Sequence, residues 1–272
     1  MENEVERVSI LRFSEEGRSN IEEIVAKEFP VTIILNNQEL VTMLCSPKDL
    51  KYLAVGFLSS EGLLKSKDEI KKIMVDDQRG VVRVETGEIK EFAQDVLFKR
   101  LITSGCGRGA SFYSAANSGS QKVESQVEIS TDEIFTLVNE FQHASDVYLA
   151  THGVHSAALC DRKSILVFSD DIGRHNAIDK IFGKCLWEDI PTIDRLVITS
   201  GRISSEILHK VAKRNIPIIV SISVPTNLGV RIADDLGITL IGSVRGRRKM
   251  NVYSSGWRIV KVEKKGNGKK TI

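Results

Sequence analysis

The spacing of apolar residues changes along the chain. The first part reads mainly as β-strands, and the part after about Ser130 as alternating strands and helices. In the first part, apolar runs at 31–35 and 39–45 flank Asn36-Asn37, a sequence that favours a tight hairpin turn. A second predicted hairpin has strands at 70–75 and 81–86.

One helix is predicted in this first part. Apolar residues recur at helical spacing from Lys48 to about Leu64. Ser46 is a good N-cap and Pro47 suits the first helical position, so the two residues should open this helix.

The second part predicts a layered domain. Its predicted helices cover 131–144, 174–186, 204–214 and 227–236, and its predicted strands cover 156–160, 164–169, 196–199, 216–222 and 239–242. Strands that alternate with helices over short links indicate a mostly parallel, three-layer α/β domain. The predicted fold class is therefore α/β for this part and α+β for the whole chain. The predicted domains are a β-rich N-terminal domain at 1–127 and an α/β domain at 128–260, followed by a basic flexible tail at 261–272.

Composition narrows the possible functions only a little. The chain has 272 residues, of which 42% are hydrophobic, and a net charge of +2, so bulk charge does not predict nucleic-acid binding. No apolar run is long enough to span a bilayer, and the N-terminus is acidic where a signal peptide would be basic. We expect a cytoplasmic protein that binds neither membrane nor nucleic acid.

The four cysteines have no paired spacing, which favours reduced thiols over a disulfide scaffold. Cys45, Cys160 and Cys185 lie in apolar periodic segments and are predicted to be core residues. Cys106 differs, because it stands in an irregular stretch, 101–125, among Gly105, Gly107 and Gly109. Glycines allow close approach of another molecule, and Arg108 favours a thiolate that accepts and releases sulfur. The alternative is an inert loop thiol.

Three polar loops fall at predicted strand ends, where open α/β sheets bind ligands. They contain His152 and His155, then Arg174 and His175, then Ser200, Gly201 and Arg202. Helix N-termini and arginines at such a place suit phosphate groups. The alternative is that Asp170 and Ser200 only cap helices.

A fourth loop follows the last predicted strand and consists of Ser243, Val244, Arg245, Gly246, Arg247 and Arg248. Glycine and arginine at a strand end suit a phosphate or pyrophosphate, although a solvated basic loop fits as well. No spacing of histidine, cysteine and carboxylate completes a zinc ligand set, so no bound metal ion is expected.

Together these segments resemble the FdhD family of formate dehydrogenase accessory sulfurtransferases. The resemblance rests on Ser-Gly-Cys at 104–106, THGVHSAAL at 151–159, SDDIGRHNAIDK at 169–180, TSGRISSE at 199–206 and SVPTNL at 223–228. It extends from about Glu28 to Arg258.

The resemblance implies a sulfurtransferase that carries sulfur from a cysteine desulfurase as a Cys106 persulfide. The acceptor would be the molybdenum bis-molybdopterin guanine dinucleotide cofactor, before its insertion into formate dehydrogenase. The resemblance also implies a cofactor-binding loop at Ser243 to Arg248, affinity for GDP-like nucleotides, a cytidine-deaminase-like C-terminal domain and a homodimer. In the deaminase comparison, Arg174-His175-Asn176 and Ser200-Gly201-Arg202 stand near zinc-ligand positions without keeping the ligands.

Two positions depart from the family pattern. Many members have Cys-x-x-Cys, whereas Gly109 stands here in place of the second cysteine. Ser243 occupies a position where an aromatic residue is expected. Besides the sulfur carrier, two other functions stay open: a cofactor-binding chaperone that transfers no sulfur, and a deaminase-like hydrolase that would need zinc.

Overall fold

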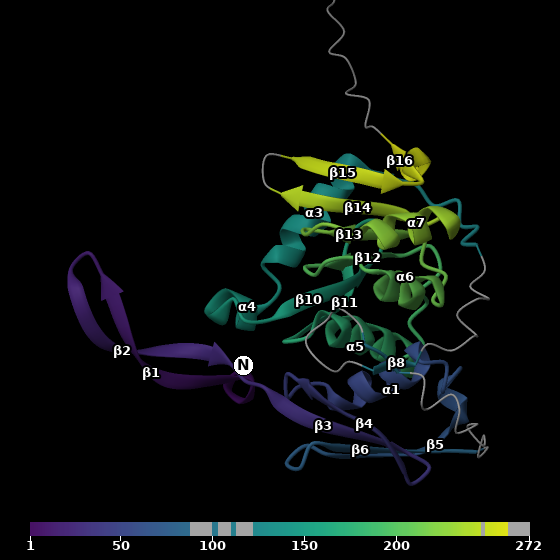
Figure 1. Cartoon of the computed structure of the whole chain (residues 1–272). Helices are drawn as coiled ribbons and strands as arrows, with labels where there is room; N and C mark the ends of the chain where they lie inside the picture. Colours follow the sequence, from purple (N-terminus) through teal and green to yellow (C-terminus); the bar gives the residue numbers. More distant parts are fainter. Residues whose placement is uncertain (88–99, 103–109, 113–121, 246–247, 261–272) are drawn as a thin grey trace, which may run out of the picture.

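The computed structural model describes residues 1–87, 100–102, 110–112, 122–245 and 248–260. A six-stranded sheet with the order β11-β10-β12-β13-β14-β15 forms the centre of the second part (Figure 1). Its strands are β10 (His155–Cys160), β11 (Ile165–Asp171), β12 (Leu196–Thr199), β13 (Ile218–Ser221), β14 (Thr239–Arg245) and β15 (Lys249–Ser254). The helices around it are α3 (Thr131–Gln142), α4 (Asp146–Thr151), α5 (Arg174–Trp187), α6 (Ser205–Ala212) and α7 (Asn227–Asp235).

This sheet is the middle of three layers, as the sequence predicts. Its side chains alternate between two buried clusters because successive residues of a strand point to opposite faces. Val197 and Ile219 join the side chains of α5, α6 and α7 on one face. Ile198 and Val220 join Ile134 and the rest of α3 on the other face.

The predicted mostly parallel arrangement is wrong, because the sheet is mixed. Only β12–β13 and β13–β14 are parallel, whereas β10–β11, β10–β12 and β14–β15 are antiparallel. A short turn joins β10 to β11, and the turn residue Asp161 accepts backbone hydrogen bonds from Lys163 and Ser164. A connection this short forces an antiparallel pair, since parallel neighbours need a long crossover.

The first part forms a separate four-stranded sheet with the order β4-β3-β6-β5. Its strands are β3 (Phe29–Leu35), β4 (Gln38–Cys45), β5 (Ile70–Asp76) and β6 (Val81–Thr86), which confirms both predicted hairpins. Asn36 and Asn37 have φ of 47° and 65°, the backbone of a two-residue hairpin turn. One face of the sheet packs on α1 (Leu50–Ser60).

The predicted start of α1 is wrong, because the helix begins at Leu50 after the N-cap Asp49. Ser46 makes distant contacts instead: its backbone N–H donates to Asp171 Oδ2 at 3.0 Å, and its hydroxyl accepts from the Ile172 N–H at 3.1 Å. These bonds draw the Ser46-Pro47 segment to the loop after β11 and leave it unavailable as a cap.

Helix α1 crosses α5 in direct backbone contact at two glycines. A methyl group on Gly56 would lie 1.8 Å from the Asp179 carbonyl oxygen, and one on Gly183 would lie 1.9 Å from the Tyr52 carbonyl oxygen. Leu186 and Trp187 of α5 also pack on the core of the first part. The predicted domains 1–127 and 128–260 therefore share a close helix–helix interface.

Replacement of Gly56 by alanine should destabilise the protein by about 3 kcal/mol, because the added methyl group must push two backbones apart. Thermal or urea unfolding measures the change. Gly256→Ala is the control, since its methyl group would meet only Val252 Cγ1 at 3.4 Å. Equal stability of the two variants would contradict the close crossing.

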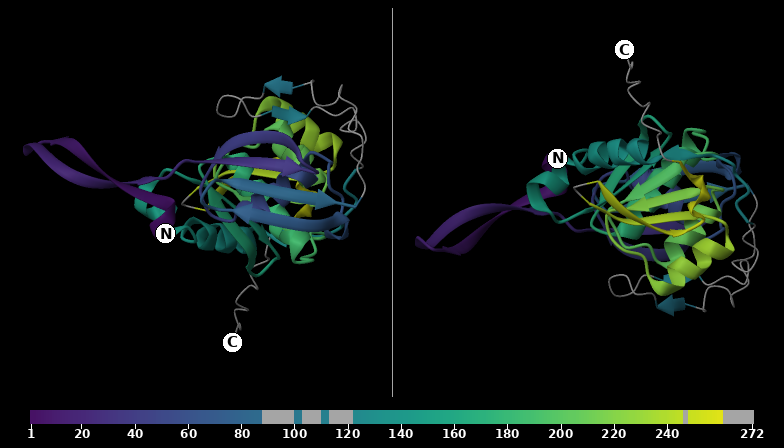
Figure 2. Two further views of the ribbon diagram at one scale, coloured as in Figure 1. Left: turned by 90° about the horizontal axis from the view of Figure 1, so that it is seen from below. Right: turned by 90° about the horizontal axis from the view of Figure 1, so that it is seen from above.

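Several elements have no individual counterpart in the sequence prediction. They are β1 (Val5–Ser14), β2 (Gly17–Ala26), β7 (Arg100–Ile102), β8 (Ala110–Phe112), β9 (Ile129–Ser130), α4, β15, β16 (Ile259–Val260) and 3-10 turns at Glu2–Glu4, Lys67–Glu69 and Gly256–Arg258. Strands β1 and β2 form a long two-stranded ribbon that extends away from the rest of the chain in all three views (Figures 1 and 2). Among the described helices, none is both long and apolar enough to cross a membrane.

Candidate functional site

The predicted strand-end loops meet at one edge of the six-stranded sheet. Strand β10 is antiparallel to β11 and β12, so its first residues lie beside their last ones. Strands β13 and β14 run parallel to β12 and therefore end at the same edge. This arrangement places the start of β10 and the loops after β11, β12, β13 and β14 along a single rim.

The loops at His155, Arg174 and Ser200 are in contact. His155 Nδ1 lies 3.2 Å from Ser200 Oγ, and the Ser156 N–H donates to that oxygen at 2.9 Å. Gly201 lies against the buried side chain of Arg174, where a methyl group on Gly201 would come within 2.7 Å of Arg174 Cβ. Gly201 is therefore needed to let the two loops approach.

Small hydroxyl side chains extend this contact along the rim. The Thr199 hydroxyl accepts from the Gly201 N–H at 3.1 Å, and the Ser221 hydroxyl donates to the Gly201 carbonyl at 2.7 Å. The Ser223 N–H donates to Ser221, and the Ser243 N–H donates to the Ser223 carbonyl at 2.7 Å. These bonds tie the ends of β12, β13 and β14 together. Thr199, Ser221 and Ser223 are not among the predicted site residues, although small hydroxyl residues at strand ends are a sequence signal for such a rim.

His155 and His175 are uncharged at neutral pH. Burial, followed by the charges of Lys210 and Arg174, lowers the pKa of His175 to about 3. Burial and the charge of Arg174 also lower the pKa of His155. His175 Nε2 lies 3.5 Å from Glu206 Oε2 at the start of α6. The positive charge of the rim therefore comes from arginine, and its histidines are polar, uncharged groups.

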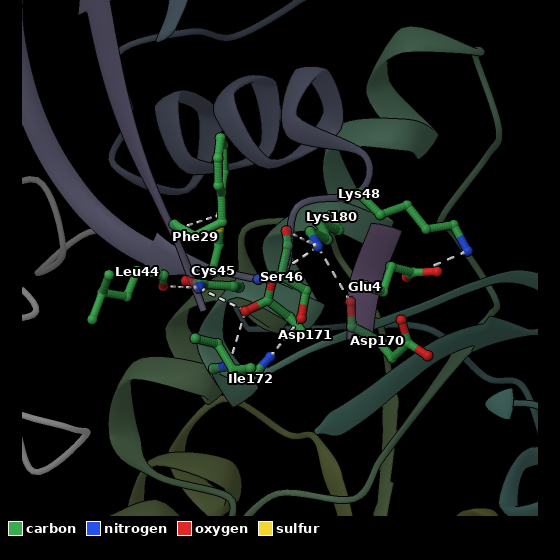
Figure 3. A network of polar contacts seen from close by, with 12 residues as sticks. Glu4, Phe29, Leu44, Cys45, Ser46, Lys48, Asp170, Asp171, Ile172 and Lys180 are labelled. Atoms are coloured by element: carbon green, nitrogen blue, oxygen red, sulfur yellow. Dashed lines mark hydrogen bonds and ion pairs between the residues drawn. The ribbon is translucent and has the colours of Figure 1, made fainter. Parts of the chain in front are cut away.

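A buried ion pair fixes the loop that carries Arg174 and His175 (Figure 3). Lys180 Nζ lies 2.7 Å from Asp171 Oδ2, and both side chains are buried. Asp171 also accepts hydrogen bonds from the N–H groups of Ser46 and Gly173 and from Asn176 Nδ2. Lys180 donates to the carbonyls of Ser46 and Asp170. The motif at 169–180 thus anchors the loop to the end of β4.

The predicted loop at 243–248 is wrong for its first three residues, because β14 continues through Arg245 before the chain returns as β15 from Lys249. Ser243 has φ of 55°, and Val244 is buried in the core, so Val244 offers only its backbone to a ligand. Arg248 forms an ion pair with Asp132 and lies over the ring of Phe135. Arg245 ends β14, and Gly246 and Arg247 lie outside the described residues.

Cys45, Cys160 and Cys185 are buried, as predicted. Burial raises the pKa of Cys45 and of Cys185 to about 12 and also raises that of Cys160. None of these three thiols is a thiolate at neutral pH. Cys106, the remaining cysteine of the sequence, lies outside the described residues.

The other predicted site residues lie on the surface of the same region. Arg202 is exposed at the start of the loop after β12, and exposed His152 ends α4 with its ring edge-on to Tyr148. In the part of the chain that the structure describes, no three histidine, cysteine or carboxylate side chains are placed to hold a metal ion.

Comparison with known proteins identifies the family of this chain. The model of the FdhD/NarQ family matches residues 26–260. The sulfur carrier protein FdhD of Bacillus subtilis is 40% identical over 92% of this chain and 95% of its own length. The protein of that name from Listeria innocua is 42% identical over 94% of this chain and 98% of its own.

A solved structure extends the likeness to the fold. A crystal structure of a Desulfotalea psychrophila protein assigned as a formate dehydrogenase accessory protein superposes with a TM-score of 0.75 at 28% identity. The match covers 94% of this chain and 99% of that one. Sequence motifs, fold and the extent of these matches lead to one conclusion: this chain belongs to the FdhD/NarQ family.

Proposed function

We propose that this chain is a sulfur carrier for formate dehydrogenase maturation, and that Cys106 carries the sulfur as a persulfide. The observation that supports this assignment best is the state of the other thiols. Cys45, Cys160 and Cys185 are buried with raised pKa values, which leaves Cys106 as the cysteine able to react. Relatives that match more than nine-tenths of the chain are named sulfur carrier proteins.

The first step is a thiol–persulfide exchange. The Cys106 thiolate attacks the terminal sulfur of a cysteine desulfurase persulfide, the donor's S–S bond breaks, and the donor cysteine leaves as a thiolate. Delivery of that sulfur as sulfide returns Cys106 to a thiolate and consumes two electrons, which a dithiol reductant supplies. The step needs no second cysteine in the chain, so Gly109 in place of a resolving cysteine is compatible with it.

The acceptor in this proposal is the molybdenum bis-molybdopterin guanine dinucleotide cofactor, bound at the sheet rim. Arg174 and Arg202 would meet its phosphates, assisted by the positive N-terminal ends of α5 and α6, neither of which has a side-chain cap. His155 and His175, both uncharged, would donate or accept hydrogen bonds. The segment from Ser243 to Arg248, which spans the end of β14 and the link to β15, would contact the nucleotide at the far end of the rim.

Persulfide detection tests the carrier function. Incubation with a cysteine desulfurase and cysteine should add 32 Da, one sulfur atom, to the intact protein, and peptide mass spectrometry should place it on Cys106. Cys106→Ala should show no addition, whereas Cys185→Ala should behave as the parent protein. Absence of added sulfur on the parent protein would reject the proposal.

The second candidate function is that of a chaperone that holds the cofactor without transferring sulfur. It is favoured by Gly109, which stands where many family members have a second cysteine after Cys106. It predicts an unmodified Cys106 after desulfurase treatment, together with intact nucleotide binding. The partners of the carrier, by contrast, are a cysteine desulfurase and formate dehydrogenase, with a homodimer as the working form.

Gly201→Ala should weaken GDP binding at least about tenfold, because its methyl group displaces the buried Arg174 side chain from the rim. Titration calorimetry with GDP measures the affinity. Gly256→Ala is the control, since it adds a methyl group after β15 without a close contact. Unchanged GDP affinity in Gly201→Ala would place the nucleotide elsewhere.

A further inference from the structure

A cavity of about 340 Å³ lies beside β11, the edge strand of the six-stranded sheet. The end of β11, the link between α3 and α4, the start of α1 and the 3-10 turn at Glu2–Glu4 contribute its walls. The residues proposed to hold the cofactor are not among those that line it. A cavity of this size can hold a small organic molecule.

Four carboxylates line this cavity, and they differ in burial. Glu4 and Asp170 are only 5% and 8% exposed, so they belong to its buried part. Asp49 is half-buried and Asp146 is exposed, which places them toward the opening. A buried carboxylate is costly unless it is paired and hydrogen-bonded, so the two buried groups need donors.

The Glu4 carboxylate is only partly satisfied. Its Oε2 atom lies 2.9 Å from the Met1 ammonium group. Its Oε1 atom is buried and has no hydrogen-bond partner among the described residues. Lys48 Nζ lies 3.8 Å from Oε1, which is beyond hydrogen-bond distance, and the Lys48 side chain is 57% exposed (Figure 3). Glu4 therefore presents a buried acceptor to a donor bound in the cavity.

The charge around the cavity favours a cationic ligand. Asp170 Oδ2 accepts from the Ser145 hydroxyl at 2.5 Å, and an ionised carboxylate has room for about four such bonds. The cavity is lined by four carboxylate residues and by three residues with ammonium groups, Met1, Lys48 and Lys184. Lys184 Nζ lies over the ring of Tyr52, which is not part of the lining.

Apolar side chains complete the lining and favour an organic cation over a metal ion. They are Ala144, Val147 and Phe168. Phe168 packs edge-on against Phe141, with ring centroids 5.9 Å apart, so this wall is fixed. Methylene groups gain from contact with such a wall, whereas a divalent metal ion binds oxygen ligands. Within the described ranges, no three histidine, cysteine or carboxylate side chains are placed to hold a metal ion.

We propose that this cavity binds an aliphatic diamine or polyamine. One ammonium group would donate to Glu4 Oε1 and to Asp170, and the methylene chain would lie against Phe168. The second ammonium group would meet Asp146 at the opening.

The chain itself provides a precedent for this contact, since the Met1 ammonium group already pairs with Glu4. Diamine binding does not depend on sulfur transfer, because it uses neither Cys106 nor the residues of the rim.

Titration calorimetry of the full chain with putrescine, at constant ionic strength, tests the proposal. Putrescine should bind with a Kd of roughly 0.1 mM or lower, and butylamine, which has a single amine, at least about tenfold more weakly. Glu4→Gln should weaken putrescine binding at least about tenfold, because it keeps the side-chain shape and removes the charge. Glu6→Gln, the same change on an exposed residue of β1, should leave it unaltered.

A second variant leaves every carboxylate in place. Ala144→Phe should fill the cavity and abolish putrescine binding, and thermal unfolding checks that the variant is folded. Absence of putrescine binding to the parent protein at millimolar concentration would overturn the proposal. Equal affinities of Glu4→Gln and Glu6→Gln, or binding that survives Ala144→Phe, would do the same. So would displacement of putrescine by an equal concentration of Mg²⁺, which would indicate general charge attraction.

Discussion

Replacement of Cys106 by alanine is expected to abolish formate dehydrogenase activity in cells that depend on this chain for maturation. Sulfur transfer through a persulfide has no substitute nucleophile here, because burial holds Cys45, Cys160 and Cys185 as neutral thiols. The measurement is formate-dependent dye reduction in a strain that lacks its own family member and carries this chain on a plasmid.

The control for that experiment is Cys185→Ala, which removes a core thiol and tests for indirect effects through stability. It should retain activity in proportion to the amount of folded protein. Activity in Cys106→Ala comparable to that of the parent protein would favour the cofactor-binding chaperone. Because both variants are assayed at matched protein levels, a folding defect cannot imitate a loss of sulfur transfer.

Lys180→Met should cost about 3–5 kcal/mol of unfolding free energy, the largest stability change that we expect from one charged side chain. The substitution leaves Asp171 as a buried carboxylate without its ammonium partner, although three N–H donors still reach it. Denaturant unfolding followed by circular dichroism gives the value.

Two comparisons sharpen this measurement. Lys67→Met breaks an exposed ion pair with Asp189 and should cost at most about 1 kcal/mol. The double variant Asp171→Asn with Lys180→Met removes both buried charges, so it should be less destabilised than the sum of the single changes. Additive effects would mean that the two charges do not interact in the folded protein.

Local sequence signals predicted most of the elements near the site. Asn36-Asn37 marked the first hairpin because asparagine tolerates the positive φ found at both positions. Ser130 and Glu133 form a capping box at the start of α3, which begins at Thr131 as predicted. Helix α5 begins at Arg174, as predicted.

The features that the sequence did not predict depend mainly on contacts between distant segments of the chain. Ser46 has the chemistry of an N-cap, yet its hydrogen bonds go to residues more than 120 positions later in the chain. Asp171 and Lys180 are polar residues in apolar surroundings, and only the fold shows that they pair. In β1 and β2, apolar and charged side chains share both faces, so the ribbon lacks the alternation that identifies a strand.

The glycine crossing of α1 and α5 also sets an order of events during synthesis. Leu186 and Trp187 pack against the core of the first sheet, and α5 also supplies the backbone that Gly56 contacts, so the first part lacks these contacts until α5 has been synthesised. The first part therefore gains its full set of packing contacts only after α5 has left the ribosome.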